Sequence, residues 1–306
     1  MNNYKPEGCL LRTEENMKYI SSLEGLKEAM ENNITVEARA ELCDSSHNLI
    51  IDLPCGVFGI IPREEGAVGI AEGLTRDIAL ISRVNKPVCF KVTGLSEKNG
   101  KYTAFLSRKK VQEECYTEYI NNLVAGDVIE ARVTHLEQFG CFVDIGCGIP
   151  SMIPIDTISV SRISHPSDRF RLGQFIRAVV KSKENGRICL THRELLGTWE
   201  ENSVNFNVGE TVSGIVRSVE DYGIFVELAP NLAGLAEVKE NVKAGQCVSV
   251  YIKAIIPEKM KIKLIIVDTC EDFSPNTDFR YYYTGEHIGK WVYAPEISGR
   301  TIETVF

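Results

Sequence analysis

The stretch Gln138-Phe139-Gly140-Cys141-Phe142-Val143-Asp144-Ile145 decides the fold of this 306-residue chain, because a closely similar stretch follows later in the sequence. The second copy reads Asp221-Tyr222-Gly223-Ile224-Phe225-Val226-Glu227-Leu228, and its first aromatic, Tyr222, lies 83 residues after Phe139. Each copy has an aromatic residue, then glycine, then a second aromatic three positions after the first. A repeat of this length exceeds the roughly 20 to 50 residues of solenoid units, so each copy predicts a small domain with its own core.

The residues around the first copy alternate between apolar and polar in the manner of half-buried strands, over 129–133 and again over 141–145. This alternation places Phe142 and Asp144 together on the outward face. Gly140 can adopt a turn or bulge conformation that would bring the ring of Phe139 to the same surface. The second copy predicts the same arrangement, with Tyr222, Phe225 and Glu227 outward. We expect two exposed aromatic pairs on which nucleic-acid bases can stack; the alternative is that a neighbouring loop or domain covers the rings.

Further strand patterns complete each repeat. The glycine-led run 173–181 and the run 187–191 follow the first copy, and the runs 245–253 and 261–264 follow the second. The pair Asn185-Gly186 predicts a hairpin turn. Five short strands with glycine at their turns are typical of a small closed barrel of the OB type.

Composition describes an ordinary soluble protein, with 44% hydrophobic and 25% charged residues. No run reaches the roughly 18 apolar residues of a membrane helix, and the N-terminus lacks a signal-peptide pattern, so we expect a cytoplasmic protein without a membrane partner. The net charge is −8, but the acidic excess lies outside the three repeats, which are each close to neutral. Such modules can bind single strands with moderate affinity through stacking and a few cations.

The sequence predicts no metal site, no cofactor and no catalytic site. Its ten cysteines are scattered singly without a C-x-x-C pair, and the five histidines show no ligand spacing. The chain also lacks a P-loop, a G-x-S-x-G elbow and an H-E-x-x-H helix. We therefore expect a protein that is not an enzyme.

The order of these segments resembles the S1 RNA-binding domain, the OB-fold module of the bacterial ribosomal protein S1 family. The resemblance rests on F-G-C-F-V-D-I-G, G-Q-F-I-R-A-V-V and R-I-C-L-T-H-R in the second repeat, and on Y-G-I-F-V-E-L, A-G-L-A-E, G-Q-C-V-S-V and K-I-K-L in the third. As a whole, the chain resembles the short S1-like small-subunit ribosomal protein homologues of Gram-positive bacteria, which have roughly three repeats.

The resemblance implies which residues would bind RNA. In the family, two aromatics from the F-G-x-F phrase, a histidine and a basic residue at the start of the last strand form the RNA face. Carried over by position, these aromatic and basic residues are Phe139, Phe142 and Arg187 in the second repeat and Tyr222, Phe225 and Lys261 in the third.

The family histidine is absent from both repeats. Pro154 replaces it in the second, and Glu237, which would repel phosphate, replaces it in the third. In the loop Thr157 to Leu172 of the second repeat, Arg169 and Arg171 could contact phosphate, although a solvated loop face is an equal alternative.

The first repeat resembles a degenerate copy. His47 and Ile50 stand where the two aromatics are expected, Asn48 replaces the glycine, and Thr103 stands at the basic position. The fold can therefore be kept without the RNA surface. Because N-terminal repeats of the longer family members bind the ribosome, we expect the first repeat to dock on the small ribosomal subunit.

The fold class predicted by the sequence and the resemblance together is mainly β, with tandem five-stranded OB-fold (S1-type) barrels joined by short helical linkers. The expected segments are an N-terminal helical segment (1–32), a degenerate S1-like domain (33–110), a helical linker (111–122), an S1 domain (123–195), a second helical linker (196–206), a second S1 domain (207–268) and an aromatic-rich C-terminal hairpin or tail (269–306). Residues 271–276 read as a linker, and aromatics on either side of Thr284-Gly285-Glu286 predict a hairpin packed on the third barrel.

The function expected from these features is non-catalytic binding of single-stranded RNA, with mRNA engaged in translation by base stacking. The alternatives are a free RNA-binding regulator of translation or transcript decay, and a protein-interaction scaffold. The sequence leaves the oligomeric state open.

Overall fold

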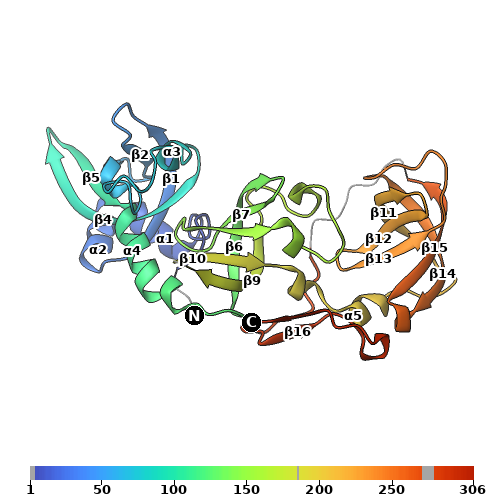
Figure 1. Ribbon diagram of the computed structural model, residues 1–306. Coiled ribbons are helices and arrows are strands. Elements are labelled where there is room, and N and C mark those ends of the chain that lie inside the picture. Colours follow the sequence, from blue (N-terminus) through green and yellow to red (C-terminus); the bar gives the residue numbers. More distant parts are fainter. Residues whose placement is uncertain (1–3, 185, 271–278) are drawn as a thin grey trace. The chain divides into compact units, whose positions relative to one another are not determined.

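The computed structural model describes residues 4–184, 186–270 and 279–306. Three closed five-stranded barrels follow one another along the chain, and a two-stranded sheet lies near the C-terminus (Figure 1). The predicted mainly β fold of tandem OB-type barrels is thereby confirmed. Asn185 of the predicted hairpin turn and the predicted linker 271–276 lie outside the described residues.

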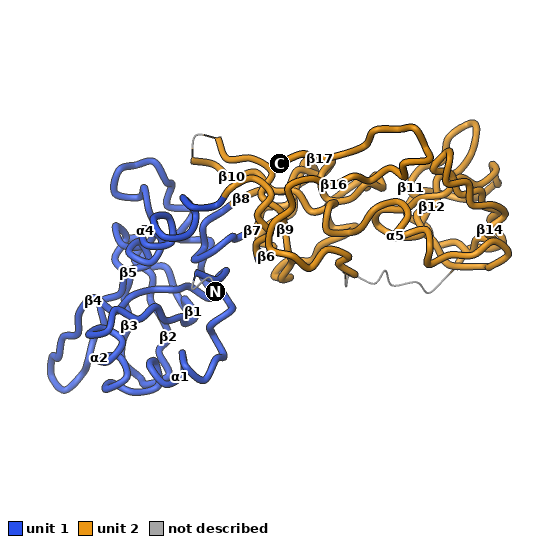
Figure 2. The backbone as a smooth tube through the Cα atoms, turned by 90° about the horizontal axis from the view of Figure 1, so that it is seen from below, with its two compact units in different colours: residues 1–123, 130–132, 144–150 blue, residues 124–129, 133–143, 151–306 orange. Residues whose placement is uncertain are grey.

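The described chain divides into two compact units (Figure 2). The first comprises residues 1–123, 130–132 and 144–150, and the second comprises residues 124–129, 133–143 and 151–306.

The first barrel belongs to the first unit and has the strand order β1-β2-β3-β5-β4. Its strands are β1 (Val36–Cys43), β2 (Leu49–Asp52), β3 (Phe58–Ile61), β4 (Pro87–Lys98) and β5 (Lys101–Ser107), and the short helices η1 (Arg63–Glu65) and α3 (Ile78–Ile81) lie between β3 and β4. The helices α1 (Glu14–Ile20) and α2 (Leu23–Glu31) precede it and place fully buried side chains, such as Leu26, in the core of this barrel.

The second barrel has the order β10-β8-β7-β6-β9. Its strands are β6 (Val128–Glu137), β7 (Gly140–Asp144), β8 (Pro150–Pro154), β9 (Phe175–Glu184) and β10 (Arg187–Thr191), and η3 (Ile155–Thr157) and η4 (Pro166–Asp168) lie in the long loop before β9. The connectors before and after it are helical, as predicted, with α4 (Arg108–Glu118) and η2 (Ile120–Asn122) on one side and η5 (Arg193–Leu196) and α5 (Trp199–Ser203) on the other.

The third barrel belongs to the second unit and has the order β11-β12-β13-β15-β14. Its elements are β11 (Thr211–Glu220), β12 (Gly223–Ala229), β13 (Leu232–Ala236), β14 (Cys247–Ile256), η6 (Pro257–Lys259) and β15 (Lys261–Thr269). Alternate residues of these strands, including Val226, Val248 and Leu264, form the core.

The predicted tail hairpin forms at a different place. The paired strands are β16 (Lys290–Val292) and β17 (Glu303–Val305), with η7 (Glu296–Ser298) between them, rather than strands on either side of Thr284-Gly285-Glu286. Trp291 and Tyr293 pack in the core cluster of the third barrel, as expected for aromatics of the tail. The earlier aromatics instead reach the second barrel, where Phe279 contacts the rings of Phe170 and His192.

Glycine is required inside the repeated phrase because another strand passes close to it. A Cβ atom on Gly140 would lie 2.7 Å from the carbonyl oxygen of Ile153, and one on Gly223 would lie 2.7 Å from that of Ala236. The expected bulge is not at the glycine: in the third barrel, the register shift lies on the preceding strand, between Val216 and Ser218.

Candidate nucleic-acid interface

The second barrel presents an aromatic pair at the start of β7. Phe139 lies in the turn before the strand and is 57% exposed, and Phe142 is half-buried on the strand. The two rings meet edge to face, with centroids 5.9 Å apart and planes at 88°. Because Phe139 belongs to the turn, both rings reach one surface although they are an odd number of residues apart.

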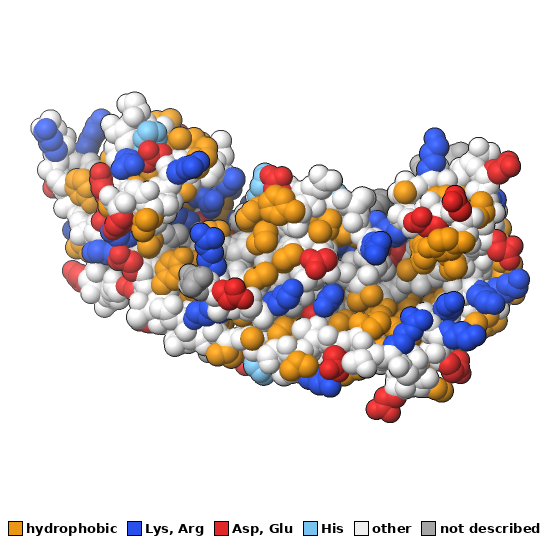
Figure 3. Space-filling model, viewed as in Figure 1, with side chains coloured by type: hydrophobic (Ala, Val, Ile, Leu, Met, Phe, Trp, Pro, Cys, Tyr) orange, Lys and Arg blue, Asp and Glu red, His pale blue; other side chains and the backbone are white. Residues whose placement is uncertain are grey.

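The third barrel repeats this geometry at the start of β12. Tyr222 is 71% exposed, Phe225 is half-buried, and their centroids are 6.2 Å apart with planes at 87°. Figure 3 shows hydrophobic side chains gathered at the surface over β7 and over the third barrel. The described residues therefore leave both pairs accessible to solvent on at least one side.

Strand register defines a row of outward residues on each barrel, which we call the platform row. In the third barrel, Ser218 pairs with Phe225, Phe225 with Leu235, and Leu235 with Lys263. The equivalent row of the second barrel is His135, Phe142, Met152 and Cys189, with Met152 and Cys189 paired and the rings of His135 and Phe142 6.3 Å apart.

The predicted basic residues flank these rows. Arg187 opens β10 and Lys261 opens β15, and both are exposed. Lys261 lies two residues before Lys263 and therefore on the same face of β15. Lys263 was missed by the sequence reasoning, which followed the family motif to the first residue of the strand; the register places Lys263 closer to the aromatic pair.

Arg169 does not lie on this surface, contrary to the prediction. Its side chain is only 4% exposed and forms an ion pair with Glu227, which is 6% exposed. Glu227 is also held by Arg217, whose Nε lies 2.8 Å from Oε2. A buried charge must be paired, so this arginine is engaged by protein and is unavailable to phosphate. Arg171, by contrast, is exposed on the same loop.

The acids two residues after each platform phenylalanine, Asp144 and Glu227, are buried rather than exposed, because other segments cover this part of the strand face. Asp144 is 3% exposed and accepts hydrogen bonds from the backbone N–H groups of Glu7 at 2.7 Å, Gly146 at 2.8 Å and Gly148 at 3.0 Å. Burial and the nearby charge of Glu7 raise the pKa of Asp144 to about 7. These acids tie segments together and leave the platform to aromatic and basic side chains.

Glu7 forms a second buried ion pair in the first unit. Burial alone would raise the pKa of Glu7, but the charge and hydrogen bonds of Arg108 outweigh this effect and lower it. The Arg108 Nε donates to Oε1 at 2.6 Å, and both side chains are 3% exposed. This pair is structural, because neither group is accessible.

The residues that stand in place of the family histidine differ in charge. Pro154, at the end of β8, is neutral, and Glu237 is acidic. Glu237 lies just after β13, and one of its carboxylate oxygens is 3.8 Å from the Nζ of Lys253. The lysine therefore offsets part of the repulsion that Glu237 would exert on a phosphate.

The first barrel carries an apolar platform row. Leu42 pairs with Ile50, Ile50 with Ile60, and Ile60 with Phe105. Leu42 is 53% exposed and Phe105 is 43% exposed, and Phe58 on β3 adds a further exposed ring. The equivalent of Lys263 is thus a phenylalanine, and the face offers neither a paired aromatic platform nor a cation at this position.

The remaining residues of the first barrel's expected site also lack RNA-binding chemistry. His47 lies in the turn before β2, where its Nδ1 is 3.9 Å from Asp77, and Asn48 bonds to Asp44 in the same turn. Thr103 is half-buried on β5.

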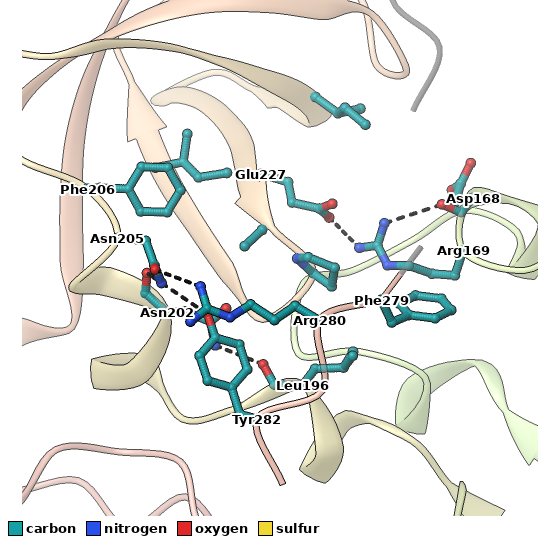
Figure 4. A pocket seen from close by; sticks show the side chains of 14 residues that line it. Asp168, Arg169, Leu196, Asn202, Asn205, Phe206, Glu227, Phe279, Arg280 and Tyr282 are labelled. Atoms are coloured by element: carbon teal, nitrogen blue, oxygen red, sulfur yellow. Dashed lines mark hydrogen bonds and ion pairs between the residues drawn. The ribbon is translucent and has the colours of Figure 1, made fainter. Parts of the chain in front are cut away.

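A cavity of about 320 Å³ lies in the second unit, beside α5 and β12 (Figure 4). Its charged and amide side chains bond to one another: Arg280 donates to Asn205 at 2.9 Å and stacks over Tyr282 at 4.8 Å, and Arg169 pairs with Glu227. The polar side chains that line the cavity are thus already paired with one another.

Within the described residues, no cluster of histidine, cysteine, aspartate and glutamate could hold a metal ion. All ten cysteines are free thiols, and burial raises the pKa of Cys141 to about 12, so that thiol is inert at neutral pH. Across 4–184, 186–270 and 279–306, the helices are too short or too polar to cross a membrane.

Comparison with known proteins supports the resemblance stated above. Residues 123–193 match the family model of the S1 RNA binding domain. The chain is 28% identical over 280 residues to the small ribosomal subunit protein bS1 of Staphylococcus saprophyticus, covering 86% of this chain and 68% of that protein. It is 29% identical over 231 residues to the protein of the same name from Rhizobium meliloti, covering 68% of this chain and 40% of that protein. The predicted resemblance to the ribosomal S1 family is thereby confirmed.

Among solved structures, a multidomain protein with nucleic acid binding domains from Streptococcus pneumoniae is similar over 79% of this chain and 76% of its own, at 13% identity and a TM-score of 0.26. At this TM-score, the similarity adds nothing to the barrels described above.

Proposed function

We propose that the chain is a non-catalytic cytoplasmic protein that binds single-stranded RNA, and that its ligand is mRNA at the small ribosomal subunit. The observation that carries this proposal is the pair of edge-to-face aromatic platforms, Phe139 with Phe142 and Tyr222 with Phe225, both at the surface of the second unit. The match of residues 123–193 to the S1 RNA binding domain supports it. We keep 33–110, 123–195 and 207–268 as the proposed bounds of the three modules.

In the proposed complex, successive bases stack on the exposed rings, and phosphates lie against Arg187 in the second barrel and against Lys261 and Lys263 in the third. Each stacked base is worth roughly 1–3 kcal/mol and adds little sequence preference, because every base has a π face. Arg171 is kept as a peripheral phosphate contact on the loop before β9. Because the net charge of the chain is −8, stacking supplies a larger share of the affinity than charge does.

The direct test is a titration of a fluorescently labelled single-stranded RNA against the wild-type protein and the Phe142→Ala and Phe225→Ala variants. Each variant should bind at least about 5-fold more weakly, and the double variant should bind weakest. Unchanged affinity in both single variants would exclude the platforms as the RNA site. A duplex RNA of the same sequence is the control and should bind much more weakly, since its bases are already stacked.

For the first barrel, we propose docking on a protein of the small ribosomal subunit. The apolar row Leu42, Ile50, Ile60 and Phe105 favours this partner over RNA, because an exposed contiguous apolar surface is typical of protein contacts. The names of the two bS1 relatives point to the small subunit. A Phe105→Asp variant should lose co-sedimentation with small subunits while its RNA affinity stays unchanged.

Sedimentation also separates the alternatives. A free RNA-binding regulator would bind RNA like the proposed protein but would not sediment with purified small subunits. A protein-interaction scaffold would bind no RNA, and its platform variants would lose a protein partner instead.

A further inference from the structure

His135 lies beside the aromatic pair of the second barrel. Its ring centroid is 6.3 Å from that of Phe142 and its plane is tilted by 36°, whereas Phe139 meets the same phenylalanine almost perpendicularly. The side chain of His135 is 62% exposed. Near the end of β6, the histidine therefore adds a second, exposed ring beside Phe142.

Glu137 holds this histidine in place. The Nε2 of His135 is 2.6 Å from Oε1 of Glu137, and Nδ1 has no hydrogen-bond partner among the described residues. The ring is thus oriented by one nitrogen, which lowers the entropy lost when a ligand binds. The other nitrogen and the ring face remain for that ligand.

The platform-row position of His135 is occupied by a different residue type in each of the three barrels. Ser218 stands there in the third barrel, paired directly with Phe225, and Leu42 stands there in the first, paired with Ile50. Among the three platform rows, the second is therefore the one with a ring at this position. Histidine is also one of the side chains on which unpaired RNA bases stack.

We propose that His135 is a third nucleobase-contacting ring of the second barrel, stacking the base next to the one on Phe142. The inference rests on the proposed RNA-binding function. It gives the second barrel one more base contact than the third, whose row has a serine at this position, and thus explains how the second barrel can bind without the histidine that the family carries elsewhere.

The chain offers a matched control. His287 is also exposed and also pairs with an acid, with its Nδ1 2.9 Å from Oδ1 of Asp127. Asp127 precedes β6, eight residues before His135, which corresponds to roughly 26 Å along an extended strand. His287→Ala thus removes the same chemistry at the opposite end of the strand.

The experiment measures the affinity of full-length His135→Ala, His135→Phe and His287→Ala for a labelled, unstructured RNA of about 12 nucleotides, a length within the range of OB-fold sites. We expect His135→Ala to bind on the order of 5-fold more weakly, and the other two variants to stay within about twofold of wild type. Thermal unfolding of each variant checks that the fold is kept. Ser218→His should conversely strengthen binding by the third barrel, measured in a Phe142→Ala background.

Wild-type affinity in His135→Ala would overturn the inference, as would equal losses in His135→Ala and His135→Phe, since a phenyl ring preserves stacking. An equal loss in His287→Ala would overturn it too. Phe142→Ala separates this inference from the proposed function. If Phe142→Ala weakens binding and His135→Ala does not, only this inference fails, whereas no effect of Phe142→Ala removes the RNA-binding surface of the second barrel.

Discussion

Phe139 and Phe142 meet edge to face, with ring centroids 5.9 Å apart, so each ring fixes the other before a ligand arrives. Such pairs are worth about 0.5–1.5 kcal/mol beyond the area they bury. Tyr222 and Phe225 repeat the contact at 6.2 Å. A preformed platform spares RNA the cost of ordering the side chains on which it stacks.

Removing Phe139 should therefore weaken RNA binding without unfolding the protein. Its ring is 57% exposed, so Phe139→Ala should lower the affinity about 5-fold or more while the unfolding midpoint moves by only a few degrees. Phe170→Ala is the contrasting variant, since that ring is fully buried and its truncation should cost about 3–5 kcal/mol of stability. RNA titration and thermal unfolding check both. A large loss of stability in Phe139→Ala would contradict the exposed position of the ring.

Salt should weaken RNA binding only modestly. For single strands, the slope of log Kobs against log salt is about −0.7 for each phosphate contact, so contacts by Arg187, Lys261 and Lys263 predict a slope near −2, and the peripheral contact by Arg171 brings it to about −3. Lys263→Gln should flatten the slope by about 0.7. Lys239→Gln is the control, because the Lys239 Nζ donates to the carbonyl oxygens of Ile266 at 3.1 Å and Val267 at 2.8 Å. Titrations at several salt concentrations measure this, and equal slopes for Lys263→Gln and wild type would remove Lys263 from the site.

The barrels and the aromatic pairs were predictable because both follow from local pattern. Alternation with period two and glycine at the turns predicted strands, and the repeated aromatic-glycine phrase marked one surface. The exposure expected for Asp144 and Glu227 was wrong for a physical reason: alternation assigns a face, but it cannot show that Glu7 or Arg169, far away in sequence, covers that end of the strand. Lys263 was missed because the register between strands, which the sequence does not state, decides which lysine lies across from Leu235 and Phe225.

Arg169 should support the stability of the second unit rather than RNA binding. Arg169→Met leaves Glu227 buried with one partner fewer, so the free energy of unfolding should fall by about 3 kcal/mol. The salt slope of RNA binding should stay unchanged under conditions where the variant is folded. Arg171→Met, on the exposed part of the same loop, should leave stability unchanged within about 0.5 kcal/mol. Urea unfolding and salt titration decide the matter: a stable Arg169→Met with a flatter salt slope would return Arg169 to the RNA surface.

His192 should make the second unit less stable as the pH falls. Burial lowers the pKa of His192 to about 4, and the ring is enclosed by Phe170 and Phe279. Its Nδ1 lies 3.1 Å from the carbonyl oxygen of Ile158, and its Nε2 lies 3.3 Å from the hydroxyl of Tyr281. With Nδ1–H donating to the carbonyl and Nε2 accepting from the tyrosine hydroxyl, the ring is neutral, and burial opposes the charge that a second proton would bring.

The unfolded chain binds a proton at this histidine below pH 6.5, whereas the folded chain does so only near pH 4. Between these values, the free energy of unfolding should fall with decreasing pH by up to about 1.4 kcal/mol per pH unit, and above pH 6.5 the residue should contribute no pH dependence. His192→Gln keeps polar groups at the site but cannot be protonated, so its stability should depend less steeply on pH in this window. Urea unfolding at several pH values between 4.5 and 7.5 measures the difference in unfolding free energy between wild type and His192→Gln. Carboxylates that titrate in both proteins contribute equally and drop out of this difference. Parallel stability curves would show that His192 is protonated as readily in the folded chain as in the unfolded one.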